Sequence, residues 1–451
     1  MDNFQSKIAG EMIVSPQIFS RIQAQITTLP AFKEEINVVL AKSASQLSEV
    51  IMAGAINLNV SDIHLEPQED TAKMRVRIDG TLQDVTDFDF KAYQSLLSRI
   101  KLLSGLKLNV ANRPQDGRFS VVLPNLSIEV RTSSLPAESG ESLVLRVLNP
   151  KNLVSIEGLG MRQDLLEVVK KEIRKPNGMI IITGPTGSGK TTTLYAILKQ
   201  IQRPEVKIIT LEDPVEYHLK GISQTQVDPE KSYDVINPGT FAQAKSPGYN
   251  FANGLKAIMR QDPEVILVGE IRDLETASIG LQAALTGHLV LTTLHTNDST
   301  GTVSRLQALG EKPANIAPAL NMAIAQRLVR KICPKCREMI APSDEDKAKI
   351  KNALKGVPKD IASYQTNFRI PRAVGCKECN LTGFKERVGL FEAFIVNDEM
   401  ERFILSAPSI SSLREKVISE GMITLYQDGI IKALNGLTTI EEVEKVAGEQ
   451  E

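Results

Sequence analysis

The apolar positions at the start of the chain follow the spacing of short amphipathic helices. Isoleucines recur four residues apart from Ile18 to Ile26, directly after a typical helix start at Ser15-Pro16. A second helix is predicted over residues 45–56. We expect residues 1–45 to form a short helical leader packed on its own protein. Docking on a partner or a membrane surface is the alternative, which the few basic residues disfavour.

The period of the pattern then changes to two, which predicts β-strands. Residues 74–82 form a predicted hairpin around an Asp79-Gly80 turn. A helix near residues 91–106 and three later strands complete a small α+β domain that ends near Pro150. The later strands are predicted at 119–123, 126–131 and 142–147, after a turn at 114–118.

One polar strand face in this domain carries Asp62, His64 and Glu66. These residue types resemble metal ligands, but three side chains along one strand rarely converge on one ion. We therefore expect a solvated or interface face.

From about residue 165, apolar runs alternate with helical stretches, which indicates a parallel α/β core. The runs that predict central strands are 179–183, 207–211, 265–268 and 288–295. A helix is predicted at 254–260, and the Pro- and Gly-rich stretch before it predicts a surface loop.

The first central strand leads into Gly-Pro-Thr-Gly-Ser-Gly-Lys-Thr-Thr at residues 184–192. Strand, glycine loop and helix follow in the order of a P-loop, whose N–H groups and helix dipole favour a phosphate. Lys190 would contact the β- and γ-phosphates, and the Thr191 hydroxyl would ligate Mg²⁺. The expected nucleotide-binding residues are Gly184, Pro185, Thr186, Gly187, Ser188, Gly189, Lys190, Thr191 and Thr192.

Acidic residues follow the next predicted strands, at the edge where a P-loop enzyme handles Mg²⁺ and water. Glu270 resembles a Walker B acid and would hold Mg²⁺ through water. Glu212 and Glu216 can orient or deprotonate water, and Asp213 can order the loop. The sequence leaves the catalytic base open between Glu216 and Glu270.

His288 and His295 lie at the two ends of one predicted strand. Their odd spacing puts them on opposite faces, so we do not expect them to share a metal. Either could hydrogen-bond a γ-phosphate or a neighbouring subunit, and a satisfied core histidine is the alternative.

The four cysteines form two CxxC pairs, Cys333 with Cys336 and Cys376 with Cys379. This pairing predicts a structural Cys₄ zinc site, since disulfides are disfavoured in a cytosolic chain. The stretch between the pairs exceeds the usual spacing of such sites and therefore predicts an inserted subdomain rather than a compact finger.

Composition narrows the functional classes. A chain of 451 residues can form two or three domains. The formal net charge of −1 and the absence of Trp argue against nucleic acid as the main partner. No window approaches the ~20 apolar residues of a membrane span, and no signal peptide is evident. We expect a cytosolic protein.

The motifs together resemble those of the type II secretion and type IV pilus assembly ATPases, over about residues 45–445. The shared motifs are Asp62–Pro67, Arg77–Gly80, Pro114–Arg118, the P-loop, Glu212–Glu216, Arg260–Pro263, Gly269–Asp273, Thr286–His288, Thr293–Thr296 and the cysteine pairs.

The resemblance implies a homo-hexameric motor at the cytoplasmic face of the inner membrane, acting on a membrane platform protein and using ATP, Mg²⁺ and Zn²⁺. Glu216 is then the water-activating acid, Glu270 the Walker B acid, and Arg118 and Arg131 are expected to reach nucleotide. The implied parts are the leader (1–45), a PAS-like domain (46–152), a linker (153–164) and a RecA-like ATPase domain (165–451). This last domain includes a zinc-binding insertion (330–395) and C-terminal helices (396–451).

Two features depart from the family pattern. The stretch between Gln226 and Phe251 looks longer than usual, and we expect the larger recruitment domain of assembly members to be absent, which leaves the docking mode open.

A retraction motor is the alternative, disfavoured because retraction motors generally lack the four cysteines. A RecA-like DNA motor is disfavoured by the near-neutral charge. Pilus assembly and type II secretion are not distinguished.

Overall fold

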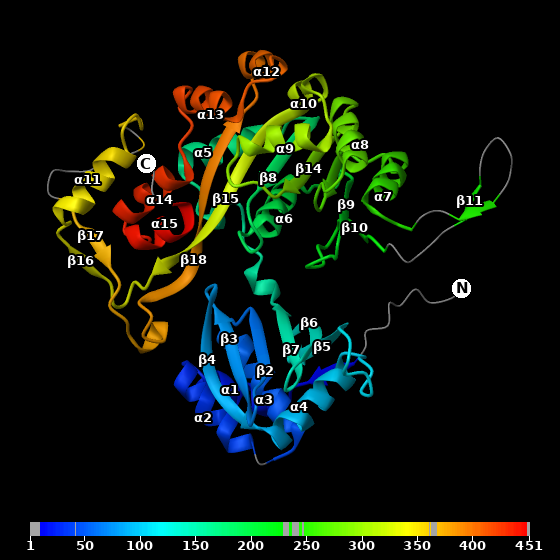
Figure 1. The fold of residues 1–451 in the computed structure, drawn as a ribbon, viewed down its shortest axis with the longest axis vertical. Coiled ribbons are helices and arrows are strands. Elements are labelled where there is room, and N and C mark those ends of the chain that lie inside the picture. Colours follow the sequence, from blue (N-terminus) through cyan, green and yellow to red (C-terminus); the bar gives the residue numbers. More distant parts are fainter. Residues whose placement is uncertain are drawn as a thin grey trace. The chain divides into compact units, whose positions relative to one another are not determined.

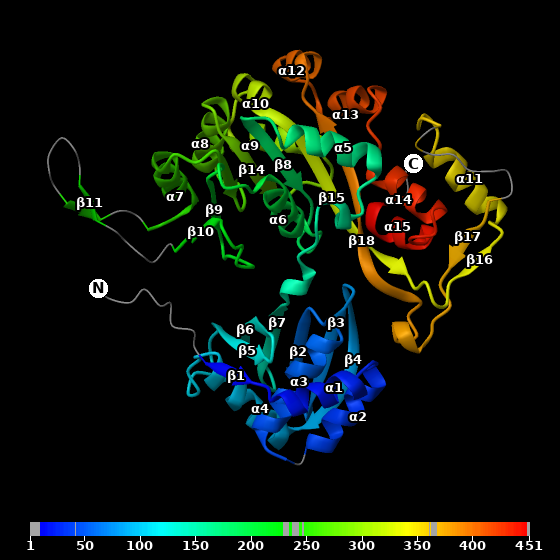
Figure 2. The same cartoon turned by 180° about the vertical axis from the view of Figure 1, so that it is seen from behind.

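The computed structural model describes residues 10–40, 42–228, 234–236, 243–245, 248–359, 361 and 368–448. The chain divides into two compact units, whose helices and strands are labelled from opposite sides in Figures 1 and 2. The first unit comprises Met1–Asn152, Cys333–Arg337 and Ala373–Glu386. The second comprises Leu153–Ile332, Glu338–Arg372 and Arg387–Glu451.

The first unit is built on a seven-stranded sheet of order β1-β5-β6-β7-β2-β3-β4. Strands β1 and β5 pair parallel, and the other neighbours pair antiparallel. The elements are β1 (Glu11–Ile13), α1 (Pro16–Gln25), α2 (Leu29–Leu40), α3 (Ala44–Asn57), β2 (Asp62–Pro67), β3 (Thr71–Ile78), β4 (Thr81–Asp89), α4 (Phe90–Leu103), β5 (Gln115–Leu123), β6 (Leu126–Ala137) and β7 (Gly140–Leu148).

Local signals explain several of these boundaries. The Ser15 side chain accepts a hydrogen bond from the Ile18 N–H and caps α1. Asp79 and Gly80 adopt positive φ angles of 51° and 86°, which gives the tight turn between β3 and β4. The predicted turn at 114–118 is wrong from its second residue, because β5 begins at Gln115 and pairs there with β6.

The apolar faces of α1 to α4 pack on one face of this sheet. Every second residue of β3 is buried, from Ala72 to Ile78, as its alternating pattern predicts. Phe32 and Ile36 of α2 are fully buried in the same core. The helices of the leader therefore complete the core of the first unit, and the opposite face of the sheet is left to polar side chains.

The second unit is built on a seven-stranded sheet of order β10-β9-β13-β14-β8-β15-β18. Its elements are α5 (Gln163–Glu172), β8 (Gly178–Thr183), α6 (Lys190–Ile201), β9 (Ile208–Glu212), β10 (Ser223–Gln226), β11 (Asp234–Ile236), β12 (Gln243–Lys245), α7 (Phe251–Ile258), β13 (Val265–Val268), α8 (Leu274–Leu285), β14 (Leu289–Leu294), α9 (Gly301–Leu309), α10 (Pro313–Ala319), β15 (Leu320–Ile332), β16 (Glu338–Ile340), α11 (Asp344–Ala353), β17 (Ile370–Arg372), β18 (Phe384–Ile395), α12 (Asp398–Leu405), α13 (Ile410–Ser419), α14 (Leu425–Leu434) and α15 (Ile440–Ala447).

Helices cover both faces of this second sheet (Figure 1). Residues of α7 to α10, α12 and α13 form one apolar layer with the sheet, and residues of α5 and α6 form the other. Strands β10, β9, β13, β14, β8 and β15 run parallel, so their carboxyl ends meet at one edge. That edge is where ligands bind in open α/β sheets. Half of the stretch 226–251, expected to be unusually long, lies outside the described residues.

Candidate nucleotide-binding site

The glycine loop between β8 and α6 has the backbone of an anion cradle. Gly184, Gly187 and Gly189 have φ angles of 150°, 79° and 88°, which side-chain-bearing residues rarely adopt. Helix α6 starts at Lys190 with no side chain capping its first turn. Its first N–H groups and the positive end of its dipole are therefore available to an anion.

Close packing against β15 adds a second reason for glycine at position 184. A Cβ atom there would lie 2.5 Å from the carbonyl oxygen of Gln326 and 2.6 Å from the Ser188 hydroxyl. The Ser188 Oγ is buried and makes no hydrogen bond within the described part of the chain. A buried hydroxyl of this kind is costly without a partner, and a phosphate oxygen would supply one.

Lys190 points back into the cradle. Its Nζ donates hydrogen bonds to the carbonyl oxygens of Gly184 and Pro185, at 2.7 and 3.1 Å. Burial lowers the pKa of Lys190 to about 8; the Glu270 carboxylate opposes this change and Arg327 adds to it. The Glu270 carboxylate therefore does not fully balance the positive charge of the Lys190 ammonium group.

Acidic and basic side chains meet at the adjacent strand ends. Glu270, one residue beyond Gly269 at the end of β13, forms an ion pair with Arg272 and lies 3.7 Å from His295 Nε2. Arg272 also lies 3.6 Å from the Asp213 carboxylate. Burial lowers the pKa of His295, and the charge of Lys190 lowers it further. The fold therefore brings Lys190, Glu270, His295 and Asp213 to one edge of the sheet.

Glu212 and Glu216 differ in their surroundings. The Glu212 carboxylate is buried and accepts hydrogen bonds from Tyr195, from Thr210 at 2.5 Å and from Gln224 at 3.2 Å. The Tyr195 hydroxyl also accepts a hydrogen bond from the Glu216 N–H at 3.3 Å. Glu212 thus holds Tyr195, which in turn holds the backbone of Glu216. The Glu216 side chain is half-buried.

The remaining predicted residues of this unit fall in two places. Pro185, Thr186 and Gly187 are exposed on the glycine loop, while Thr191 and Thr192 are half-buried in the first turn of α6. His288 precedes β14 at the other end from His295, and its Nδ1 lies 3.0 Å from the Ala283 carbonyl oxygen. The structure does not bring His288 to the P-loop edge.

A row of arginines crosses the polar face of the first unit. Strand register places Arg118 opposite Arg131, and Arg131 opposite Arg146. Asp62 follows in the row, 3.1 Å from Arg146 and 3.3 Å from Arg77. Directly opposite residues share a sheet face, so four guanidinium groups and one carboxylate lie along one line. Guanidinium groups are suited to phosphate recognition.

The polar face around His64 and Glu66 is organised by ion pairs. Glu66 accepts two hydrogen bonds from Arg75, at 2.9 and 2.7 Å. His64 Nδ1 lies 4.0 Å from the same carboxylate, and burial lowers the pKa of His64. The carboxylates on this strand are therefore partners of arginines.

The four cysteine sulfurs lie together, within 4.8 Å of one another. Among the described residues, no other group of three or more His, Cys, Asp or Glu is close enough to hold a metal. The Cys333 and Cys376 sulfurs are 3.9 Å apart, and those of Cys336 and Cys379 are 3.8 Å apart. Each pair joins sulfurs from the two separate CxxC motifs.

Three residues of the site escaped the sequence analysis: Arg272, Arg327 and Tyr195. Arg272 lies inside the Gly269–Asp273 motif, two residues after Glu270, so the sequence contained a signal that could have identified it. Arg327 reaches the glycine loop only because β15 pairs with β8. Tyr195 reaches Glu212 only because α6 packs on the sheet that contains β9. No local pattern signals these long-range contacts.

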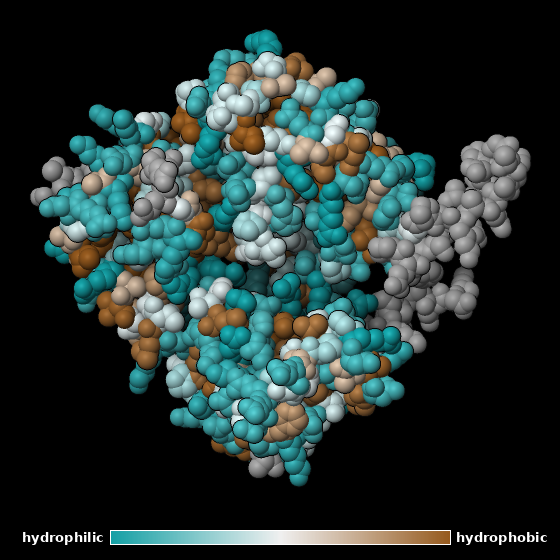
Figure 3. Space-filling view, in the orientation of Figure 1, coloured by the Kyte–Doolittle hydropathy of each residue, from teal (hydrophilic) through white to brown (hydrophobic). Residues whose placement is uncertain are grey.

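No helix in the described part of the chain is both long and apolar enough to cross a membrane. The face of the molecule in Figure 3 is mainly hydrophilic, with hydrophobic residues scattered over it.

Comparison with known proteins identifies relatives along most of the chain. Residues 40–445 match the family described as "Type II/IV secretion system protein". The chain is 39% identical over 402 residues to the type IV pilus assembly ATPase PilB of Thermus thermophilus, covering 89% of this chain but only 42% of that protein. It is 40% identical over 406 residues to the type II secretion system protein E of Pseudomonas aeruginosa, covering 90% and 76% of the two chains.

Solved structures show the same fold. The Legionella pneumophila ATPase DotB matches with a TM-score of 0.62 at 21% identity, over 89% of this chain and 95% of that one. The pilus retraction motor PilT, solved with bound ADP, matches with a TM-score of 0.56 at 25% identity, over 88% and 95%. The resemblance found from the sequence motifs is thereby confirmed: the chain belongs to the type II/IV secretion system protein family.

Proposed function

We propose that this protein is a Mg²⁺-dependent ATPase that works as a homo-hexameric motor for assembly of a type IV pilus or a type II secretion pseudopilus. The observation that carries the proposal is the glycine loop, which is flanked by an uncapped helix start, a half-buried lysine and an unpartnered Ser188 hydroxyl. The names of the PilB and protein E relatives support the same assignment. A retraction motor is the alternative, supported only by the likeness to PilT.

The roles of individual residues follow from their positions. The N–H groups of residues 184–192 and the Lys190 ammonium bind the phosphates. Thr191 and Glu270 would hold Mg²⁺, which when bound would neutralise charge on the phosphates. Glu216 orients and deprotonates the attacking water. Buried Glu212 positions the backbone of Glu216 through Tyr195. His295 can hydrogen-bond the γ-phosphate.

The arginine row supports a role for the first unit in turnover. Arg118 and Arg131 would place guanidinium groups on the nucleotide, and such a group is worth ~10³–10⁵ in rate when it stabilises the transition state. In this proposal residues 46–152, which lie in the first unit, form the PAS-like domain, and residues 165–451 form the RecA-like ATPase domain. The hexamer acts on a platform protein at the cytoplasmic face of the inner membrane.

The cysteine cluster fits zinc. Four sulfurs in a tetrahedron with Zn–S bonds of about 2.3 Å lie about 3.8 Å apart, and the observed separations include 3.9, 3.8 and 3.7 Å. The N–H groups of Cys376 and Gly383 donate to the Cys379 sulfur, at 3.1 and 3.2 Å, which favours the thiolate. The ion would tie the two CxxC loops together.

The catalytic proposal is tested by ATP turnover of the full chain with Lys190→Ala. Loss of the phosphate-binding ammonium should lower kcat at least about a hundredfold while the protein stays folded. Lys199→Ala, at the exposed end of the same helix, is the matched control and should keep the wild-type rate. Equal turnover in wild type and Lys190→Ala would refute the assignment.

Metal analysis tests the zinc proposal. We expect one zinc per chain in reduced protein, and its removal by a chelator should lower the midpoint of thermal unfolding, because closed zinc sites contribute folding energy. A protein with intact thiols, no metal and an unchanged unfolding midpoint after chelation would contradict it.

A further inference from the structure

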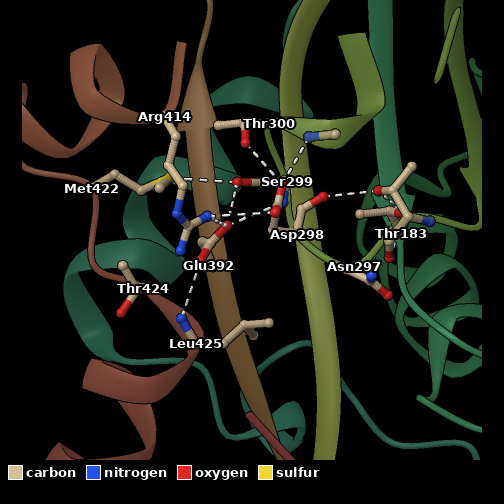
Figure 4. A network of polar contacts seen from close by, with 12 residues as sticks. Thr183, Asn297, Asp298, Ser299, Thr300, Glu392, Arg414, Met422, Thr424 and Leu425 are labelled. Carbon is tan, nitrogen blue, oxygen red and sulfur yellow. Dashed lines mark hydrogen bonds and ion pairs between the residues drawn. The ribbon is translucent and has the colours of Figure 1, made fainter. Parts of the chain in front are cut away.

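The segment between β14 and α9, residues 295–300, connects the P-loop to the C-terminal helices (Figure 4); we refer to it as the 295–300 loop. On the P-loop side, Thr183 is its main partner. The Thr183 Oγ1 accepts a hydrogen bond from the Thr296 N–H at 2.8 Å and lies 2.7 Å from the Thr296 Oγ1. Thr183 is the residue before Gly184, so the loop is fixed directly to the start of the phosphate cradle.

Arg327 provides a second link on the same side. Its Nη2 donates to the Asn297 carbonyl oxygen at 2.7 Å. The same guanidinium group borders the glycine loop, since a Cβ atom at Gly184 would lie 3.1 Å from Arg327 Nη1. Any displacement of the 295–300 loop would therefore act on the cradle through both Thr183 and Arg327.

On its other side, the loop is held by Glu392 of β18. The Glu392 Oε1 accepts hydrogen bonds from the N–H and the hydroxyl of Ser299, at 3.0 and 2.8 Å. Its Oε2 accepts one from the N–H of Leu425, the first residue of α14, at 3.2 Å. The Glu392 residue is 1% exposed. A carboxylate this deeply buried is tolerated only when it is hydrogen-bonded and balanced by a cation.

Arg414 of α13 contributes such a cation, and Arg327 also interacts electrostatically with Glu392. The Arg414 Nη1 lies 3.5 Å from the Glu392 carboxylate and 3.7 Å from that of Asp298 in the loop. The same nitrogen is buried and makes no hydrogen bond in the described part of the chain, so both contacts are ion pairs without hydrogen-bond geometry. A small movement of α13 would convert either of them into a hydrogen bond.

We propose that Arg414 and Glu392 are positioning residues, which fix the 295–300 loop and thereby set the geometry of the P-loop during turnover. This proposal rests on the ATPase function proposed above. None of the nucleotide-contacting roles assigned there uses Asp298, Ser299, Glu392 or Arg414. The network makes the position of α13, which is far from the P-loop in sequence, a determinant of the rate.

The first test is the kinetics of Arg414→Gln in the full chain. Release of the loop should lower kcat for ATP about tenfold to a hundredfold, since misplacement by about 1 Å has effects of that size. The KM for ATP should change less than about twofold, because the residues that hold the phosphates are intact. Arg414→Lys, which keeps the charge, should recover part of the rate.

Coupling between the two residues gives a second readout. Because Arg414 and Glu392 act on the same loop, Glu392→Gln combined with Arg414→Gln should lower kcat no more than the more damaging single change. Lys416→Gln is the matched control: it lies on α13 but pairs with Glu399 and Glu420, and should leave kcat unchanged.

Hydrogen exchange of the nucleotide-free protein separates this proposal from the ATPase proposal. The peptide that contains Ser299 and Gly301 should exchange faster in Arg414→Gln than in wild type, even if the protein hydrolyses no ATP. Unchanged exchange there, or unchanged kcat in folded Arg414→Gln, would overturn the positioning role. A wild-type protein without turnover would refute the ATPase function, and the exchange result would still decide whether Arg414 holds the loop.

Discussion

At the residue scale, spacing in the sequence was enough to find several charged side chains of the site, but it did not reveal Arg327 or the burial and hydrogen bonds of the side chains that it found. Lys190, Glu270 and His295 are recognisable because each follows an apolar run that forms a parallel strand, and parallel strands end at one edge. The sequence could not show that Glu212 is buried and hydrogen-bonded by Tyr195, because that contact depends on helix–sheet packing. The choice between Glu216 and Glu270 as base stays a prediction.

The lowered pKa of Lys190 has a measurable consequence for nucleotide affinity. Burial puts this pKa at about 8 in the protein alone, and bound phosphates should raise it because they favour the ammonium form. Binding then takes up a proton above pH 8, so the Kd for an ATP analogue should rise by up to about tenfold per pH unit between pH 8 and the pKa of the complex. Titrations at pH 7, 8 and 9 measure this effect. Lys190→Arg stays charged and should give a flatter profile, and a flat wild-type profile would contradict the prediction.

At the element scale, periodicity predicted most helices and strands and failed where pairing overrides local preference. Residues 114–118 contain Pro, Asp and Gly and look like a turn, yet most of them extend β5 because β6 pairs with them. The edge strand β1 had no signal at all, since it is too short to show a period. Where a local signal sets the boundary, the prediction was accurate. Helix α3 begins at Ala44, one residue before the predicted start, because the Ser43 side chain caps it.

Packing between α2 and α3 depends on a glycine in the middle of α3. A Cβ atom at Gly54 would lie 2.4 and 2.8 Å from two ring atoms of Phe32. Gly54→Ala should therefore lower the free energy of unfolding of the first unit by about 1–3 kcal/mol, measured by urea titration. Gly280→Ala is the control, since its nearest neighbour is the flexible end of Met179 at 3.3 Å. A Gly54→Ala protein as stable as wild type would show that Phe32 can move aside.

At the scale of the whole molecule, motifs spread over most of the chain were enough to identify the family. The same motifs did not show that segments from the later part of the chain belong to the first unit. The cysteine loops are separated from residues 1–152 by the whole stretch Leu153–Ile332, and a sequence pattern does not report which unit a distant segment joins. The resemblance led us to place the cysteines in the ATPase part of the chain, and the boundaries of that division stay a prediction.

Assembly into a hexamer should appear as a dependence of specific ATPase rate on protein concentration. If arginines of the first unit act on nucleotide, Arg118→Ala should lower the rate at least about tenfold at every concentration. Light scattering should show the same mass as wild type. Arg113→Ala, an exposed neighbour outside the arginine row, is the control. A concentration-independent rate that Arg118→Ala leaves unchanged would contradict a ring motor of this kind.

Because the chain path is interleaved, only certain combinations of segments can be exchanged between related proteins by recombination. Residues 333–337 and 373–386 pack within the first unit although both are flanked by the second. A recombinant in which residues 1–152 came from a distant relative would keep its original cysteine loops against a foreign partner surface. Successful chimaeras would need to transfer all of these separate stretches together, so we expect natural variation in them to be inherited jointly.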